Sequence, residues 1–135
     1  MICRVSLLAV CLVLLAGCGM LAKTQDDHRQ ELIEKANVVW TAKKAGNCAP
    51  QYDLATEEFR RKVDRDKFVS RCNLRIKSYT IDRVEFVSET EALVCVTYVV
   101  NPMGFEFNVP TKTRWLLEHG EWRLEPSSRL LPMMQ

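Results

Sequence analysis

The spacing of the apolar residues changes once along this chain of 135 residues, close to Arg75. Before that point they recur at the spacing of one helix face: Leu32, Ile33, Ala36, Val39 and Trp40. After it they alternate with polar residues, which is the pattern of a strand with one buried face. A chain with helices first and strands afterwards is typical of the α+β class, in which helices pack on an antiparallel sheet.

Three helices are expected in the first half. The longest covers about 27–45 and ends where Lys43 and Lys44 precede Gly46, since cations favour the last turn of a helix and glycine its end. Two shorter helices follow, over about 51–61 and 65–71, each with an apolar face.

Four strands are expected in the second half, over 76–88, 91–101, 105–117 and 121–125. His119-Gly120 and Pro102-Met103-Gly104 leave only short connections between neighbouring strands. Such connections suit antiparallel hairpins. We therefore predict one long and two short helices packed on a curved antiparallel sheet of about four strands.

The first residues have the pattern of an export signal. One basic residue, Arg4, precedes an apolar run of 12 residues at 5–16. That run is shorter than the roughly 20 residues a helix needs to cross a bilayer, and it is typical of a secretory signal. At its end, LAGC (15–18) resembles the bacterial lipobox. The resemblance implies cleavage between Gly17 and Cys18 and lipidation of the Cys18 thiol; an ordinary signal peptide with a chance cysteine is the alternative.

Lipidation would anchor the protein to the bacterial cell envelope. One acyl chain binds a membrane only marginally, whereas two or more anchor it stably, so a matured Cys18 would make the membrane a permanent partner. Gly19, and not an aspartate, follows the lipidated cysteine. By resemblance to enterobacterial sorting rules, this favours the periplasmic face of the outer membrane in a Gram-negative organism.

Four segments are therefore expected: a signal peptide at 1–17, a lipidated cysteine and flexible spacer at 18–28, a single α+β domain at 29–130 and a tail at 131–135. The formal net charge of the whole chain is +2, and no long block of one sign occurs. This balance gives no basis for nucleic-acid binding.

Six cysteines are present: Cys3, Cys11, Cys18, Cys48, Cys72 and Cys95. The first two lie in the signal and the third takes the lipid. A disulfide is permitted outside the cytoplasm, and we favour Cys48 with Cys72, whose loop of about 25 residues would contribute roughly 3 kcal/mol. Cys95 would then act as a small hydrophobic residue inside a strand, although the two other pairings stay open. No CxxC pair occurs and the histidines lie far away, so no metal site is expected.

Several motifs follow one another between about 31 and 126: Gly46 at the helix end, YDL (52–54), FR (59–60), FV (68–69), and Trp115, Gly120 and Trp122 in the last hairpin. This order resembles bacterial members of the nuclear transport factor 2-like superfamily. The resemblance implies a cystatin-like fold with a cone between helices and sheet, which several members use as an enzyme pocket.

The strand at 91–101 is apolar on both faces. One row holds Ala92, Val94, Val96, Tyr98 and Val100, and the other holds Leu93, Cys95, Thr97 and Val99. One row must pack on the helices, and the other needs cover because large apolar patches are unusual on soluble monomers. We predict a homodimer or a protein partner on the outer sheet face; strand curvature and the tail residues 130–134 are the alternative cover.

Four aromatic residues are candidates for lining a pocket in the cone: Trp40, Tyr52, Tyr98 and Trp115. Packing in the core is the other role open to them. An apolar cone of this kind could hold a lipid or another hydrophobic ligand without a cofactor. We therefore expect a non-catalytic binding or interaction module for a protein partner or a small apolar ligand.

The alternative function is a small pocket enzyme of the isomerase or dehydratase type, which the family resemblance allows. Proton transfer needs a positioned acid or base, and the candidates are Tyr52, Asp82 and Glu106. His28 lies beside the spacer and His119 in a hairpin turn, and both are expected to be solvated. A third alternative is a purely structural role with dimerisation as the only interaction.

Overall fold

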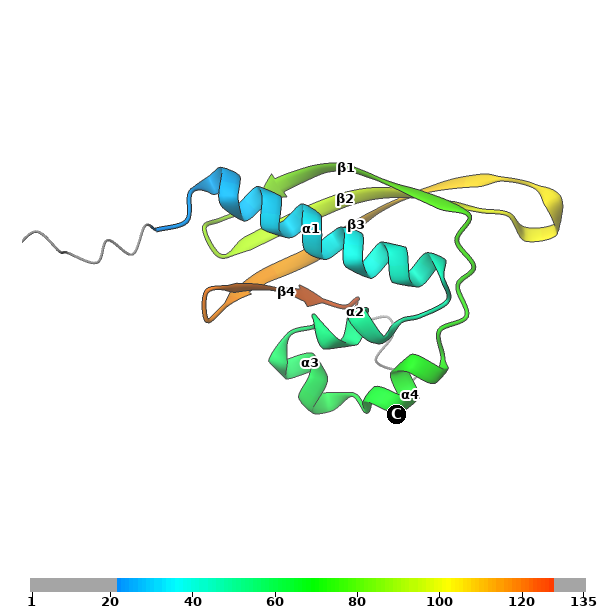
Figure 1. The fold of residues 1–135 in the computed structure, drawn as a ribbon, viewed down its shortest axis with the longest axis horizontal. Helices are drawn as coiled ribbons and strands as arrows, with labels where there is room; N and C mark the ends of the chain where they lie inside the picture. The colour runs from blue at the N-terminus through cyan, green and yellow to red at the C-terminus, as the bar shows by residue number, and fades with distance from the viewer. Residues whose placement is uncertain (1–21, 128–135) are drawn as a thin grey trace, which may run out of the picture.

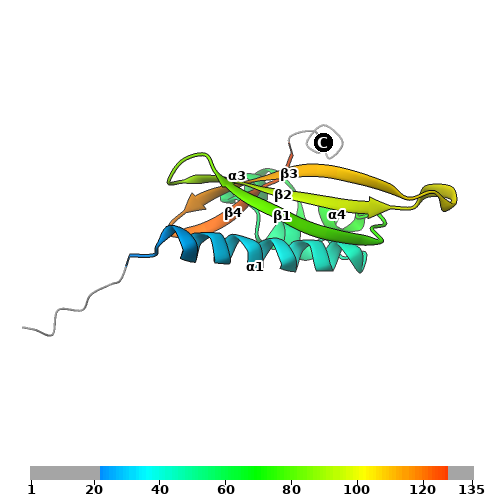
Figure 2. The same cartoon turned by 90° about the horizontal axis from the view of Figure 1, so that it is seen from above.

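In a computed structural model that describes residues 22–127, the chain forms helices packed on one four-stranded antiparallel sheet (Figure 1). The elements are α1 (Gln25–Lys44), α2 (Ala49–Asp53), α3 (Glu57–Lys62), α4 (Arg65–Ser70), β1 (Ser78–Phe86), β2 (Glu91–Val100), β3 (Phe107–Glu118) and β4 (Glu121–Glu125). The sheet is curved and unclosed, and α1 lies along one of its faces (Figure 2). The α+β prediction is confirmed, while predictions for 1–21 and 128–135 lie outside the described residues.

A capping box starts α1 earlier than the apolar spacing predicts. The Thr24 hydroxyl accepts a hydrogen bond from the Asp27 amide, and the Asp27 carboxylate accepts one from the Thr24 amide. Both bonds satisfy amides that a helix start leaves free. Because α1 begins at Gln25, the spacer predicted for 18–28 overlaps the first turn of the helix. His28, expected to be solvated, is half-buried instead, and its Nδ1 accepts a hydrogen bond of 2.9 Å from Trp122 Nε1.

The single helix predicted over 51–61 is two helices. Between α2 and α3 the backbone pairs with β4: the Leu124 amide donates to the Leu54 carbonyl, and the Thr56 amide donates to the Leu124 carbonyl, both at 2.8 Å. The Thr56 hydroxyl then caps α3 by accepting from the Phe59 amide. A continuous helix would lose these bonds to the sheet.

The short helices share a core of their own, here called the helical cluster: Cys48, Tyr52, Ala55, Phe59, Val63 and Phe68. The rings of Tyr52, Phe59 and Phe68 pack with centroids between 5.5 and 6.1 Å apart. The disulfide Cys48–Cys72, with Cα atoms 5.7 Å apart, ties the start of α2 to the chain after α4. The preferred cysteine pairing is confirmed.

The strands pair in sequence order, β1-β2-β3-β4, and each is antiparallel to the next. The β3–β4 hairpin turns at His119 (φ 50°) and Gly120 (φ 78°), and two positive φ values suit a two-residue hairpin. The β2–β3 hairpin turns through a 3-10 segment, Pro102–Gly104. It protrudes beyond the rest of the molecule (Figures 1 and 2), with Met103 and Phe105 exposed at its tip.

The main core lies between α1 and the inner face of the sheet. Trp115 and Trp122 are completely buried there, together with Leu32 of α1 and with Val94 and Val96 of β2. The row of β2 that contains these two valines therefore packs on the helices, in line with the alternation in the sequence.

Charged side chains cover part of the outer row of β2. Cys95 stands in register between Arg83 of β1 and Lys112 of β3. Glu85 joins the two cations through ion pairs of 2.8 and 3.3 Å. The Cys95 thiol is thus buried, and burial raises its pKa. Long charged side chains cover apolar surface with their stems, so they supply some of the cover that the sequence analysis assigned to a partner.

Candidate ligand-binding cavity

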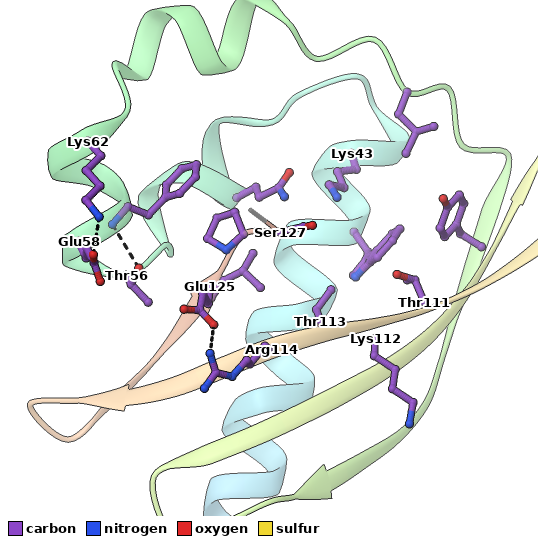
Figure 3. Close-up of a pocket in the computed structure, with 17 residues that line it drawn as sticks. Lys43, Thr56, Glu58, Lys62, Thr111, Lys112, Thr113, Arg114, Glu125 and Ser127 are labelled. Atoms are coloured by element: carbon purple, nitrogen blue, oxygen red, sulfur yellow. Dashed lines mark hydrogen bonds and ion pairs between the residues drawn. The ribbon is translucent and has the colours of Figure 1, made fainter. Parts of the chain in front are cut away.

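An open cavity of about 690 Å³ lies where the sheet extends past β4 (Figure 3). β4 pairs only with the last residues of β3, from Arg114 to Glu118, so the earlier half of β3 has no fourth strand beside it. Residues of α1, α2, α3 and the chain just after β4 surround the space that is left. The shortness of β4 therefore creates the cavity.

One wall of the cavity is aromatic. Trp40 of α1 lies against Tyr98 of β2, with ring centroids 5.2 Å apart, and against Tyr79 of β1 at 6.1 Å. The Tyr79 hydroxyl is held by Thr41 Oγ1 at 2.8 Å and by Asn37 Oδ1 at 3.0 Å. The wall is thus fixed from behind, and a preformed surface loses little further freedom when a ligand binds.

The rest of the lining mixes apolar side chains with hydroxyl groups. Phe59, Leu124 and Pro126 are buried side chains that contribute apolar surface. On β3, Thr113 is already engaged, because its hydroxyl accepts from Trp115 Nε1 at 3.1 Å and donates to the Val94 carbonyl at 3.2 Å. The cavity therefore combines an aromatic and apolar wall with hydroxyl, amide and charged groups that can orient a ligand.

Lys43 adds a positive charge to this lining from the last turn of α1. Its Nζ lies 4.6 Å from the centre of the Trp40 ring. Burial lowers the pKa of Lys43 to about 8. The aromatic face favours the charged ammonium and acts in the opposite direction.

The two carboxylates of the lining are each paired with a cation (Figure 3). Glu58 pairs with Lys62 of the same helix at 2.5 Å, and Glu125 pairs with Arg114 across the β3–β4 hairpin. Lys112, the remaining cation, reaches Glu85 on the outer face. Among the described residues, Lys43 is thus the cavity cation that no carboxylate neutralises.

Of the four aromatic pocket candidates, Trp40 and Tyr98 line the cavity and the other two do not. Tyr52 belongs to the helical cluster, where its hydroxyl lies 2.9 Å from the Arg60 carbonyl and 2.7 Å from the Val63 carbonyl. Trp115 is enclosed in the main core. Two of the four aromatics are therefore structural.

The three residues proposed for catalysis are not brought together. Tyr52 is enclosed in the helical cluster. Asp82 stands on the outer face of the sheet and accepts a hydrogen bond of 2.7 Å from Thr97 Oγ1. Glu106 lies at the base of the protruding hairpin, paired with Lys77. None of the three lines the cavity.

Sequence reasoning assigned Lys43 only to the helix end and missed its place in the cavity. The signal was present: Lys43 follows Val39 by four positions and Trp40 by three, so it continues the buried stripe of α1.

Comparison with known proteins adds no assignment, since neither a protein-family model nor a curated protein matches this sequence. Within residues 22–127 no group of three or more His, Cys, Asp or Glu is placed to hold a metal ion. In the same part of the chain, no helix combines the length and the apolar character that crossing a bilayer requires.

Proposed function

We propose that this protein is a lipid-anchored envelope protein whose domain binds a small apolar ligand without catalysing a reaction on it. The observation that carries the binding function is the open cavity with its fixed Trp40–Tyr98 wall. The lipobox-like LAGC at 15–18 supports the anchor at Cys18, and the periplasmic face of the outer membrane is the location favoured by Gly19.

The size of the cavity and its aromatic wall support a ligand of modest size. Small-molecule sites usually enclose roughly 300–1,000 Å³ and are lined by apolar and aromatic side chains with few polar groups. At about 690 Å³, this cavity falls within that range. Trp40, Tyr98 and Leu124 provide apolar surface from three different elements, so a ligand would contact a helix and two strands at once.

The state of the carboxylates favours binding over proton transfer. A catalytic acid or base needs a carboxyl group that is free to exchange a proton near the operating pH. In the cavity lining, Glu58 is neutralised by Lys62 and Glu125 by Arg114. The lysine lowers the pKa of Glu58 through a hydrogen bond, which keeps that carboxylate ionised and unsuited to donating a proton.

The fold supports, at a coarser level, the proposed kinship with nuclear transport factor 2-like domains. A long helix, short helices and a curved four-stranded sheet occur in the order that the resemblance implies. Fold does not determine function, so the binding proposal depends on the cavity itself.

A cavity-filling substitution tests the proposal. Thr111 lines the cavity from β3, and Thr111→Trp should fill it, whereas Asn108→Trp places the same side chain on the outer face of the same strand. The protein would be a soluble form comprising residues 19–135, which retains every described element, titrated with 1-decanol in a calorimeter. We expect saturable binding by the parent and by N108W, and at least a tenfold loss in T111W.

Thermal unfolding of the two variants would show whether each is folded. Absence of decanol binding by the parent, or equal binding by a folded T111W, would contradict the proposed function.

A further inference from the structure

Lys43 occupies a position where the helix pattern calls for an apolar residue. The buried stripe of α1 runs through Leu32, Ala36 and Val39 to Trp40, and Lys43 continues it by one more turn. Its Nζ lies over the indole ring of Trp40. Lys44, the next residue, is exposed, so only one of the two adjacent lysines is directed into the cavity.

Withdrawing an ammonium from water is costly unless an opposite charge or several hydrogen bonds replace the water. The ring face of Trp40 replaces part of that water, but no carboxylate of the described residues does. The lowered pKa of Lys43 reflects the part of this desolvation cost that Trp40 does not offset. An anion bound in the cavity would remove this cost, and a charge-assisted hydrogen bond to it would be stronger than one between neutral groups.

The other charged groups of the lining limit the anion to a single charge. Those groups, together with the one ionisable phenol, are Glu58, Lys62, Tyr98, Lys112, Arg114 and Glu125. Lys62 and Arg114 pair with the lining's own carboxylates, and Lys112 is drawn to the outer face by Glu85, which it shares with Arg83. Among the described residues of the lining, Lys43 is therefore the cation with no carboxylate partner, which suits a monoanion and gives a dianion no second partner.

We propose that the cavity binds an amphiphile with one carboxylate, whose head pairs with the Lys43 ammonium while its apolar body lies along Trp40, Tyr98 and Leu124. This inference rests on the proposed function and adds to it the chemical class of the ligand. Charge complementarity selects the head group and the apolar wall selects the body.

Three ligands with the same alkyl chain test the inference: decanoate, 1-decanol and decyltrimethylammonium. The same soluble form, residues 19–135, would be titrated with each at pH 7 by calorimetry. We expect decanoate to bind at least tenfold more tightly than decanol, and decyltrimethylammonium to bind more weakly than either. In Lys43→Met, which keeps the stem over Trp40, the preference for decanoate should disappear while decanol still binds.

Lys44→Met is the matched control, because it removes a lysine charge from the same helix turn, at an exposed residue that does not line the cavity. It should retain the decanoate preference. As a second readout, the preference of the parent should fall as the pH rises above 8, by up to tenfold per pH unit, because free Lys43 loses its proton there. In K43M it should not change with pH.

The outcomes separate the two proposals. If none of the three ligands binds, the proposed function itself fails. If decanol and decanoate bind equally to the parent, or if K43M keeps the preference, the domain is a binding protein but Lys43 does not select a carboxylate.

Discussion

At the scale of the residue, Lys43 should make the free energy of unfolding depend on pH. Its pKa is about 8 in the folded domain, against 10.5 for an unperturbed lysine. The unfolded chain therefore binds more protons between these values, and the stability of the parent rises with pH across this window. Below pH 8 the folded domain bears the full cost of partly burying the charge.

Lys43→Met removes that cost while keeping an apolar stem beside Trp40. We expect K43M to be more stable than the parent by about 1–2 kcal/mol at pH 7, after allowance for the lost contact between cation and ring. The difference should shrink by about 1 kcal/mol towards pH 9.5. Urea unfolding of both proteins at several pH values would measure it. A constant difference between the two proteins would show that Lys43 is not enclosed as described.

Also at the residue scale, the sequence predicted part of the cavity and missed the rest for physical reasons. Trp40 and Tyr98 could be named because large aromatics on a helix stripe and on a strand row must meet. Tyr52 shares those properties, but its burial with Phe59 depends on a break between α2 and α3 that no local pattern marks. Lys43 was passed over because cations at helix ends are ordinarily solvated.

At the scale of the element, the disulfide should hold the helical cluster to the rest of the domain. Cys48 and Cys72 are separated by 24 residues, and a bridge over such a loop contributes roughly 3 kcal/mol by restricting the unfolded chain. The double variant C48S/C72S should lose about that much stability. In hydrogen exchange, the amides of α2, α3 and α4 should lose protection more than those of the sheet.

Cys95→Ala is the matched control for this prediction. Cys95 lies on the outer face of the sheet, outside the helical cluster. C95A should lower the free energy of unfolding without changing the hydrogen-exchange protection of the short helices relative to that of the strands. Equal loss of protection in all elements of C48S/C72S would mean that the helical cluster has no separate dependence on the disulfide.

The elements themselves followed from local patterns where neighbours along the chain determine them. The change of apolar spacing near Arg75 predicted helices before strands, and His119-Gly120 predicted the last hairpin. The start of α1 and the division into α2 and α3 were missed. The first depends on a capping box that precedes the apolar stripe, and the second on hydrogen bonds to β4, about 70 residues further along the chain.

At the scale of the whole molecule, the cavity lies at the C-terminal end of α1, whereas the predicted membrane anchor at Cys18 precedes this helix in the sequence. Lys43 follows Gln25 by 18 residues, which corresponds to roughly 27 Å along a helix. The described chain enters at the N-terminal end of α1, on the side away from the protruding hairpin (Figures 1 and 2). If the chain is anchored at Cys18, as proposed, we expect the cavity to stay open to solvent. The predicted partner of the outer sheet face stays a prediction, and oligomeric state in solution would test it.

Cys18→Ser should abolish the anchor that this arrangement requires. A serine hydroxyl cannot replace the thiol in acylation, and the described residues contain no helix able to span a bilayer. We expect C18S to accumulate as an unlipidated precursor of higher mass than the mature chain. Cys11→Ser, within the same predicted signal, should be processed normally. Mass spectrometry and detergent partitioning of the three proteins would decide, because a C18S chain with the mass and the partitioning of the parent excludes lipidation at this cysteine.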